Sequence, residues 1–168
     1  VIYAPSYQAS SIENFALCEY LASHGYIVIS SPSRGTETRW FGRNNAKEME
    51  TQARDVEFLI KEVSKFPMAD SNKIATMGFS FGGLANILAI TRNDKIKAVV
   101  SLDGTERYQY GLLKKSPFFE SEKVDVPYIH MAQKNIPEQV LKEDNIDPEL
   151  NSKFQLFDSI RNSNAYRL

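Results

Sequence analysis

The 168-residue sequence predicts an α/β fold, a three-layer α/β/α sandwich around a mainly parallel sheet. Short apolar runs alternate along the chain with longer segments of helical periodicity, a pattern typical of successive βαβ units. The run at 26–30 is almost continuously apolar, as expected for a strand covered on both faces. The length fits one domain that buries a substantial core.

The first elements are predicted as strand, helix and strand. Residues 1–4 read Val-Ile-Tyr-Ala, a strand that Pro5 ends. Apolar residues recur near helical spacing over 11–23, and Gly25 can end that helix in a left-handed conformation. The apolar run at 26–30 then supplies the second strand.

The middle of the chain predicts a helix, a strand and a second helix. Residues 46–66 carry one apolar face at helical spacing, and Pro67 ends the pattern. A strand follows at 73–77. The helix at 82–92 is rich in small and aliphatic residues, which predicts that it is buried.

The last third alternates in the same way around a polar segment. Its predicted elements are a strand at 96–102, an irregular segment at 103–125, a strand at 126–131, a helix from Asp147 or Asn151 to about Arg161, and the opening of a strand at 165–168. In a parallel sheet the carboxyl ends of the strands share one edge, and the ligand site lies outside that edge. The loops that follow the strands should therefore converge there.

Composition excludes several classes of protein. Lys and Arg number 20 against 21 Asp and Glu, which leaves no electrostatic footprint for nucleic acid. No stretch is apolar for long enough to form a transmembrane segment. A single cysteine, Cys18, allows no disulfide within the chain.

The strongest local signal is the run Gly-Phe-Ser-Phe-Gly-Gly at 78–83. It fits the Gly-x-Ser-x-Gly nucleophile elbow, in which a sharp strand-to-helix turn exposes the serine hydroxyl. The context is the required one, with a strand at 73–77 before it and a small-residue helix after it. The alternative is a glycine-rich turn that packs closely or binds phosphate. The motif and its context favour Ser80 as a nucleophile.

Several stretches resemble the platelet-activating-factor acetylhydrolase and dienelactone hydrolase branch of the α/β-hydrolases. They are 1–7, 21–28, 73–83 and 98–103. The resemblance covers most of 1–131 and fades afterwards. It implies an α/β-hydrolase fold and a serine hydrolase that cleaves carboxylic esters, acyl, acetyl or lipid-like, through an acyl-enzyme on Ser80.

The triad acid is expected after the nucleophile in the chain. Asp103 follows the strand at 96–102, and the resembling branch has its acid at this place. Asp103-Gly104 can also be read simply as a turn. The rival carboxylate is Glu138, in the loop after Met131.

The histidine base should follow the acid, and the chain has only two histidines. His24 precedes Asp103, and His130 falls inside a predicted strand. The family's histidine follows the strand that begins here at 165, so we expect the base beyond Leu168. We therefore expect 1–168 to be one incomplete α/β-hydrolase domain, without its first strands and its histidine loop.

The oxyanion hole should use two backbone amides. One is that of Phe81, directly after the nucleophile. By resemblance the other is that of Tyr7, in the loop after the first strand. Many relatives have His-Gly where this chain has Pro5-Ser6. This loop can also be read as a simple turn.

Substrate contacts are expected from the loop after the second strand. Arg34 and Trp40 are candidates, although Arg34 fits a surface position and Trp40 a core position equally well. The chemistry requires no metal or organic cofactor, and the sequence offers no His and Cys cluster for a metal. Two alternatives stay open: an inactive binding protein of the same fold, and a peptidase.

Overall fold

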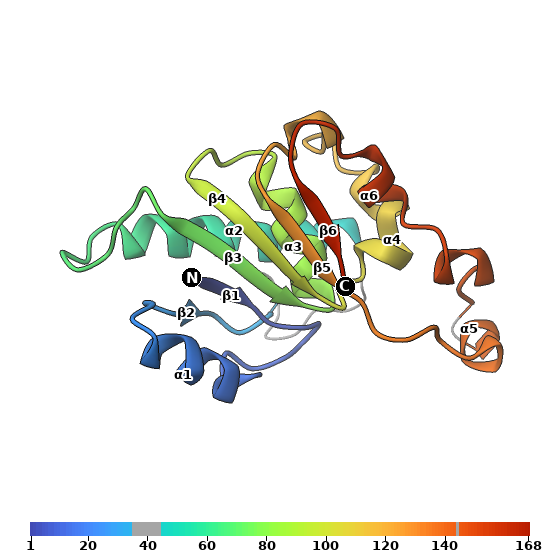
Figure 1. The fold of residues 1–168 in the computed structure, drawn as a ribbon, viewed down its shortest axis with the longest axis horizontal. Coiled ribbons are helices and arrows are strands. Elements are labelled where there is room, and N and C mark those ends of the chain that lie inside the picture. The colour runs from blue at the N-terminus through green and yellow to red at the C-terminus, as the bar shows by residue number, and fades with distance from the viewer. Residues whose placement is uncertain (35–44, 144) are drawn as a thin grey trace.

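The computed structural model describes residues 1–34, 45–143 and 145–168. Within these residues one sheet of six parallel strands runs in the order β2-β1-β3-β4-β5-β6 (Figure 1). The strands are β1 (Ile2–Ala4), β2 (Ile29–Ser30), β3 (Ile74–Phe79), β4 (Ile96–Leu102), β5 (Tyr128–Met131) and β6 (Ala165–Arg167). The prediction of a parallel sheet is confirmed, and the strand carboxyl ends share one edge.

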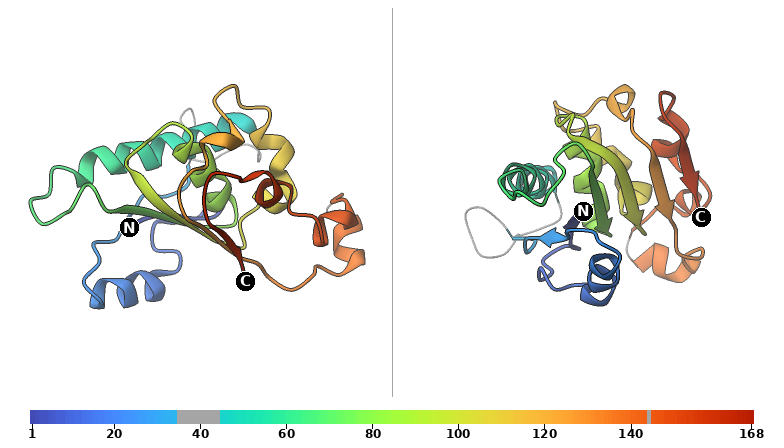
Figure 2. Two further views of the ribbon diagram at one scale, coloured as in Figure 1. Left: turned by 45° about the horizontal axis from the view of Figure 1, so that its top comes forward. Right: turned by 60° about the vertical axis from the view of Figure 1, so that its left-hand side comes forward.

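Helices flank the sheet as the sandwich requires. They are α1 (Phe15–Ser23), α2 (Ala46–Val63), α3 (Phe81–Ile90), α4 (Glu106–Leu113), α5 (Glu138–Glu143) and α6 (Gln155–Ser159), with 3₁₀ turns η1 (Ser121–Lys123) and η2 (Pro148–Asn151). In Figure 1, α2 and α3 lie behind the sheet, and Figure 2 shows α1 on the other side. None of the described helices is long and apolar enough to span a bilayer.

Helix α2 begins at a capping box. The Asn45 side chain accepts hydrogen bonds from the amides of Lys47 and Glu48, and the Glu48 carboxylate accepts one from the Asn45 amide. These bonds satisfy amides that have no partner within the helix. Further along, a buried stripe that includes Val56 and Ile60 packs into the core.

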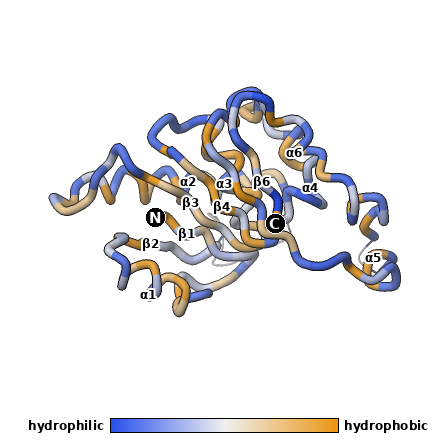
Figure 3. The backbone as a smooth tube through the Cα atoms, in the orientation of Figure 1, coloured by the Kyte–Doolittle hydropathy of each residue, from blue (hydrophilic) through white to orange (hydrophobic). Residues whose placement is uncertain are grey.

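Helix α3 occupies the centre of the core, because all ten of its residues are buried. Its small and aliphatic side chains pack against β3, β4 and α2. Figure 3 shows the apolar residues concentrated along the central strands and α3, with polar segments in the outer loops. The predicted burial of this helix is confirmed. Because α3 is held in the core, the turn at Ser80 that precedes it is held in place as well.

Helix α1 differs from the prediction at its start. It begins at Phe15, after Asn14 in a left-handed conformation, so residues 11–14 are not α-helical. Its end matches the prediction: Gly25 has φ +87°, its amide donates to Ala22, and the amide of Tyr26 donates to Leu21. This pair of bonds is a Schellman motif, which favours glycine at that position.

Three other expectations are wrong. β2 is a two-residue, half-buried edge strand of the described sheet and is not covered on both faces. The segment at 103–125, expected to be irregular, contains α4. The helix expected between 147 and 161 is broken into η2 and α6, because Phe154 between them has a non-helical φ of −114° and ψ of 77°.

Candidate active site

The sheet reverses its strand order at β1, which has β2 on one side and β3 on the other. In open α/β sheets, ligands bind outside the carboxyl ends of the strands at such a switch point. Two segments lie at that point: the loop after β1, which begins at Pro5, and the turn after β3, at Ser80. The topology alone therefore selects the two segments that the sequence singled out.

Ser80 connects β3 directly to α3 and adopts a strained backbone conformation. Its φ is 52° and its ψ is −118°, a combination that costs a non-glycine residue about 1–3 kcal/mol. Its amide donates to the carbonyl of Leu102 at 3.1 Å, and its carbonyl accepts from the amide of Thr105 at 3.0 Å. The elbow is thus hydrogen-bonded on both sides to the chain around the end of β4.

Glycine is required on both sides of Ser80 because other backbone atoms approach closely. A Cβ atom at Gly78 would lie 2.4 Å from the carbonyl carbon of Gly82. A Cβ atom at Gly82 would lie 2.0 Å from the carbonyl oxygen of Ala4 and 2.7 Å from that of Pro5. The first turn of α3 is therefore pressed against the end of β1, which brings the loop after β1 next to the nucleophile.

We expect Gly82→Ala to lower the free energy of unfolding by about 3 kcal/mol or more, because its methyl group would collide with backbone that cannot move aside. Gly111→Ala is the matched control. Gly111 lies in α4 with open space around its Cβ position, so this change should stabilise by about 1 kcal/mol. Urea unfolding followed by circular dichroism measures both. Equal stabilities of the two variants would contradict the close approach.

Asp103 leaves β4 at the same level as Ser80 leaves β3, since Phe79 is in register with Leu102. Neighbouring strands are about 5 Å apart, so the structure brings the predicted nucleophile and acid together at one edge. Asp103 has φ 47°, its amide donates to the carbonyl of Met131 at 2.7 Å, and its Oδ1 accepts from the amide of Gln133 at 3.2 Å. These bonds hold the carboxylate at the end of β4.

The loop after β1 is fixed by polar side chains. The Ser6 amide donates to the Glu13 carboxylate at 2.7 Å, and the Ser6 hydroxyl also donates to it. Gln52 of α2 donates to the Pro5 carbonyl at 2.7 Å. The Ser6 amide is thus engaged with Glu13, and the role of Tyr7 as the second oxyanion donor stays a prediction.

Tyr7 packs directly on the elbow. Its ring meets that of Phe81 edge to face, with centroids 5.6 Å apart. Burial, together with the charge and hydrogen bond of Glu48, raises the pKa of the Tyr7 hydroxyl. The two residues predicted to supply oxyanion amides therefore come from different segments and lie side by side.

Neither histidine of the chain is placed as the base. His24 is exposed at the end of α1, where Nδ1 lies 2.9 Å from the carbonyl oxygen of Tyr20. His130 is fully buried inside β5, and its Nδ1 lies 2.9 Å from Glu106 Oε1. The prediction that the base lies outside residues 1–168 stays a prediction.

The structure does not bring the remaining predicted site residues to the elbow. Arg34 is exposed in the loop after β2, and Trp40 lies outside the described residues. Glu138, the rival acid, begins α5 with a side chain that is 81% exposed. Figure 1 shows α5 projecting away from the sheet. Glu138 is therefore far from the elbow, and the role of Asp103 as the acid stays a prediction.

Sequence reasoning missed three polar groups that support the site, the part-buried Glu13 and the buried Gln52 and Glu106. Gln52 is one turn after Glu48 on the buried face of α2. A polar residue within an apolar helical stripe was the one available signal. Glu13 and Glu106 follow no such pattern, because their partners lie on other elements, in the loop after β1 for Glu13 and on β5 for Glu106.

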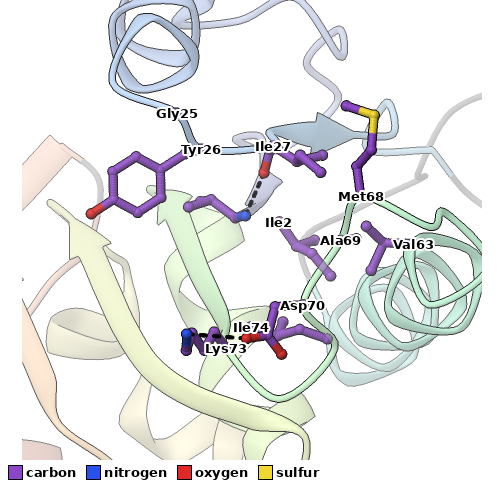
Figure 4. Close-up of a pocket in the computed structure, with 11 residues that line it drawn as sticks. Ile2, Gly25, Tyr26, Ile27, Val63, Met68, Ala69, Asp70, Lys73 and Ile74 are labelled. Carbon is purple, nitrogen blue, oxygen red and sulfur yellow. Dashed lines mark hydrogen bonds and ion pairs between the residues drawn. The ribbon is translucent and has the colours of Figure 1, made fainter.

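A cavity of about 280 Å³ lies at the opposite edge of the sheet. Its lining includes Ile2 and Ile74, at the starts of β1 and β3, and Gly25 (Figure 4). Six residues of β3 separate that edge from Ser80, a distance of about 17–20 Å. Because His24 is adjacent to Gly25, it lies at this far edge too.

Comparisons with known proteins agree with this fold. The model of the prolyl oligopeptidase family matches residues 14–128. DcsB, solved in complex with its substrate analogue, has a TM-score of 0.66 and 14% identity, covering 99% of this chain and 79% of its own. A ferulic acid esterase from Streptomyces cinnamoneus has a TM-score of 0.66 and 18% identity, covering 98% of this chain and 48% of its own. No curated protein sequence matches the chain.

At such identities the solved structures show the fold alone, which is the predicted α/β-hydrolase fold. The acetylhydrolase and dienelactone hydrolase branch stays a prediction. The family match spans more than half of the chain and includes both the elbow and Asp103. The family match, together with the α/β-hydrolase fold, supports a serine hydrolase. The chain belongs to the prolyl oligopeptidase family.

Proposed function

We propose that this chain is the core of a serine hydrolase that cleaves carboxylic esters through an acyl-enzyme on Ser80. The observation that carries the proposal is the elbow itself. Ser80 has a strained backbone conformation at the carboxyl end of β3, with α3 beginning at the next residue. Strain of this kind persists where the surrounding structure imposes it, and it clusters at active sites.

In the proposed mechanism Ser80 Oγ attacks the carbonyl carbon of the ester. The amides of Phe81 and Tyr7 stabilise the oxyanion as it forms. A histidine outside residues 1–168 takes the serine proton and passes it to the leaving alcohol, while Asp103 orients its ring. Water then releases the acyl group by the same steps. Arg34 and Trp40 stay predictions for substrate contacts.

Peptide hydrolysis is the second candidate, because the matching family is that of a peptidase. Ester hydrolysis is supported by the esterase among the structural neighbours and by the resemblance of the motif segments. Both reactions use the same nucleophile, acid and oxyanion donors. The substrate class therefore has to be measured on the full-length protein.

A fluorophosphonate probe tests the proposal, since it reacts with a serine that the site activates. The full-length protein should gain one adduct, and mass spectrometry of the digest should locate it on Ser80. In a separate assay without the probe, the full-length protein should cleave aryl and alkyl acyl esters faster than peptide anilides. Faster anilide cleavage would favour the peptidase. A protein that takes up no probe would be a binding protein of this fold.

A further inference from the structure

A buried polar cluster lies directly beneath the candidate site, formed by Ser101, Glu106, Tyr128 and His130. The Glu106 side chain of α4 is 2% exposed. Its Oε1 accepts a hydrogen bond from the Tyr128 hydroxyl at 2.7 Å and lies 2.9 Å from His130 Nδ1. Tyr128 and His130 both belong to β5, so one carboxylate ties α4 to that strand.

The Glu106 carboxylate also fills the space beside two glycines of the site. A Cβ atom at Gly104, the residue after Asp103, would lie 2.0 Å from Glu106 Oε2. A Cβ atom at Gly83, in the first turn of α3, would lie 3.0 Å from the same oxygen. Glu106 is thus wedged between the turn that carries the acid and the helix that follows the nucleophile.

That junction is where the two functional segments are joined. The amide of Ser80 bonds to the carbonyl of Leu102, and the amide of Thr105 bonds to the carbonyl of Ser80. Ser80 and Asp103 both have positive φ, so neither turn relaxes into this geometry by itself. A rigid group beneath them is needed to hold both conformations at once.

Glu106 is held as a charged group in this setting. Burial by itself would raise the pKa of its carboxyl, but the hydrogen bond and charge of His130, with the hydrogen bond from Tyr128, keep that pKa below its usual value. A buried carboxylate with several partners is costly to displace, because its removal leaves those partners unsatisfied. The cluster is therefore a stiff support.

We propose that Glu106 is a positioning residue, which holds the acid turn (residues 103–105) against the elbow (residues 80–83) and so fixes the position of Asp103 relative to Ser80. The inference rests on the proposed function for its catalytic consequence. The coupling of the two segments rests on the hydrogen bonds and close approaches alone.

The kinetic test compares Glu106→Ala and Glu106→Gln with Glu50→Gln in the full-length protein. Glu50 of α2 pairs with Arg54 of the same helix and with Arg92, which follows the end of α3, so Glu50→Gln loses charge pairs and leaves the site intact. Glu106→Ala should lower kcat about 10²-fold with KM unchanged, the cost of a small misplacement of a catalytic group. Glu106→Gln keeps the size of the side chain and should recover most of kcat. Glu50→Gln should match the wild type.

Amide hydrogen exchange supplies a readout that does not depend on activity. In Glu106→Ala the amides of Ser80 and Thr105 should exchange faster than in the wild type, and in Glu106→Gln the same amides should exchange faster by a smaller factor, while those of α2 should keep their protection in both variants. Variants with lower thermal stability but unchanged kcat and unchanged exchange at these amides would overturn the proposal. If Glu106→Ala does not fold, Glu106→Gln decides. If the wild type proves inactive, the exchange result still decides the coupling, and only the proposed function fails.

Discussion

Replacing Ser80 by alanine should lower kcat for ester hydrolysis about 10⁶-fold in the full-length protein, because the reaction then has no nucleophile to form the acyl-enzyme. A residual rate about 10³–10⁴-fold above that in water should remain, since the amides of Phe81 and Tyr7 still stabilise an oxyanion. Steady-state kinetics with an activated aryl ester measures both quantities.

Ser23→Ala is the matched control for this change. Ser23 is an exposed serine at the end of α1, whose hydroxyl donates to the carbonyl of Tyr20. Its replacement should leave kcat within a factor of two of the wild type. If Ser80→Ala kept wild-type turnover, another group would be the nucleophile and the elbow would be a structural turn.

Asparagine at position 103 should lower kcat about 10⁴-fold with little effect on stability. The side chain keeps its shape and can still accept the bond from the Gln133 amide. An uncharged amide, however, neither stabilises an imidazolium nor holds the imidazole in the required tautomer. Kinetics at pH 7, with thermal unfolding measured in parallel, separates the loss of function from a loss of fold.

Glu138→Gln distinguishes the two candidate acids. Glu138 is exposed on α5, 4.0 Å from Lys142, and no described contact ties it to the elbow. Its replacement should leave kcat unchanged. The reverse pattern, a silent Asp103→Asn and a damaging Glu138→Gln, would move the acid to the loop after β5.

The parts of the fold and site that the sequence predicted are those encoded by contiguous residues. The elbow is one such case, because 78–83 specify a strand end, a turn and a helix start without distant partners. Helix α3 is another, since most of its residues are small or aliphatic and all ten are buried. The place of Asp103 at the carboxyl end of β4 followed from the strand that precedes it.

The parts that were missed depend on contacts between distant segments. Helix α4 was not predicted because Glu106 and Arg107 are buried at positions where an apolar residue would have marked a helix. Glu106 is buried with His130, and Arg107 donates to the carbonyls of Leu150 and Asn151. In the same way, β2 lies at the edge of the described sheet because of the strand order, and the local sequence does not indicate that order.

The position of β1 has a consequence for how the chain folds. β1 lies between β2 and β3 in the described sheet, and its Ile2 pairs with Ile29 on β2 and with the distant Thr76 on β3. Such a distant pairing must close a long loop before it yields any stabilisation, which makes folding slow. During translation, therefore, the edge of β1 that faces β3 stays unpaired while more than 70 further residues emerge. Such an unpaired strand edge is exposed to aggregation in that interval, and Tyr7, in the loop after β1, can pack on Phe81 of α3 only when the interval is over.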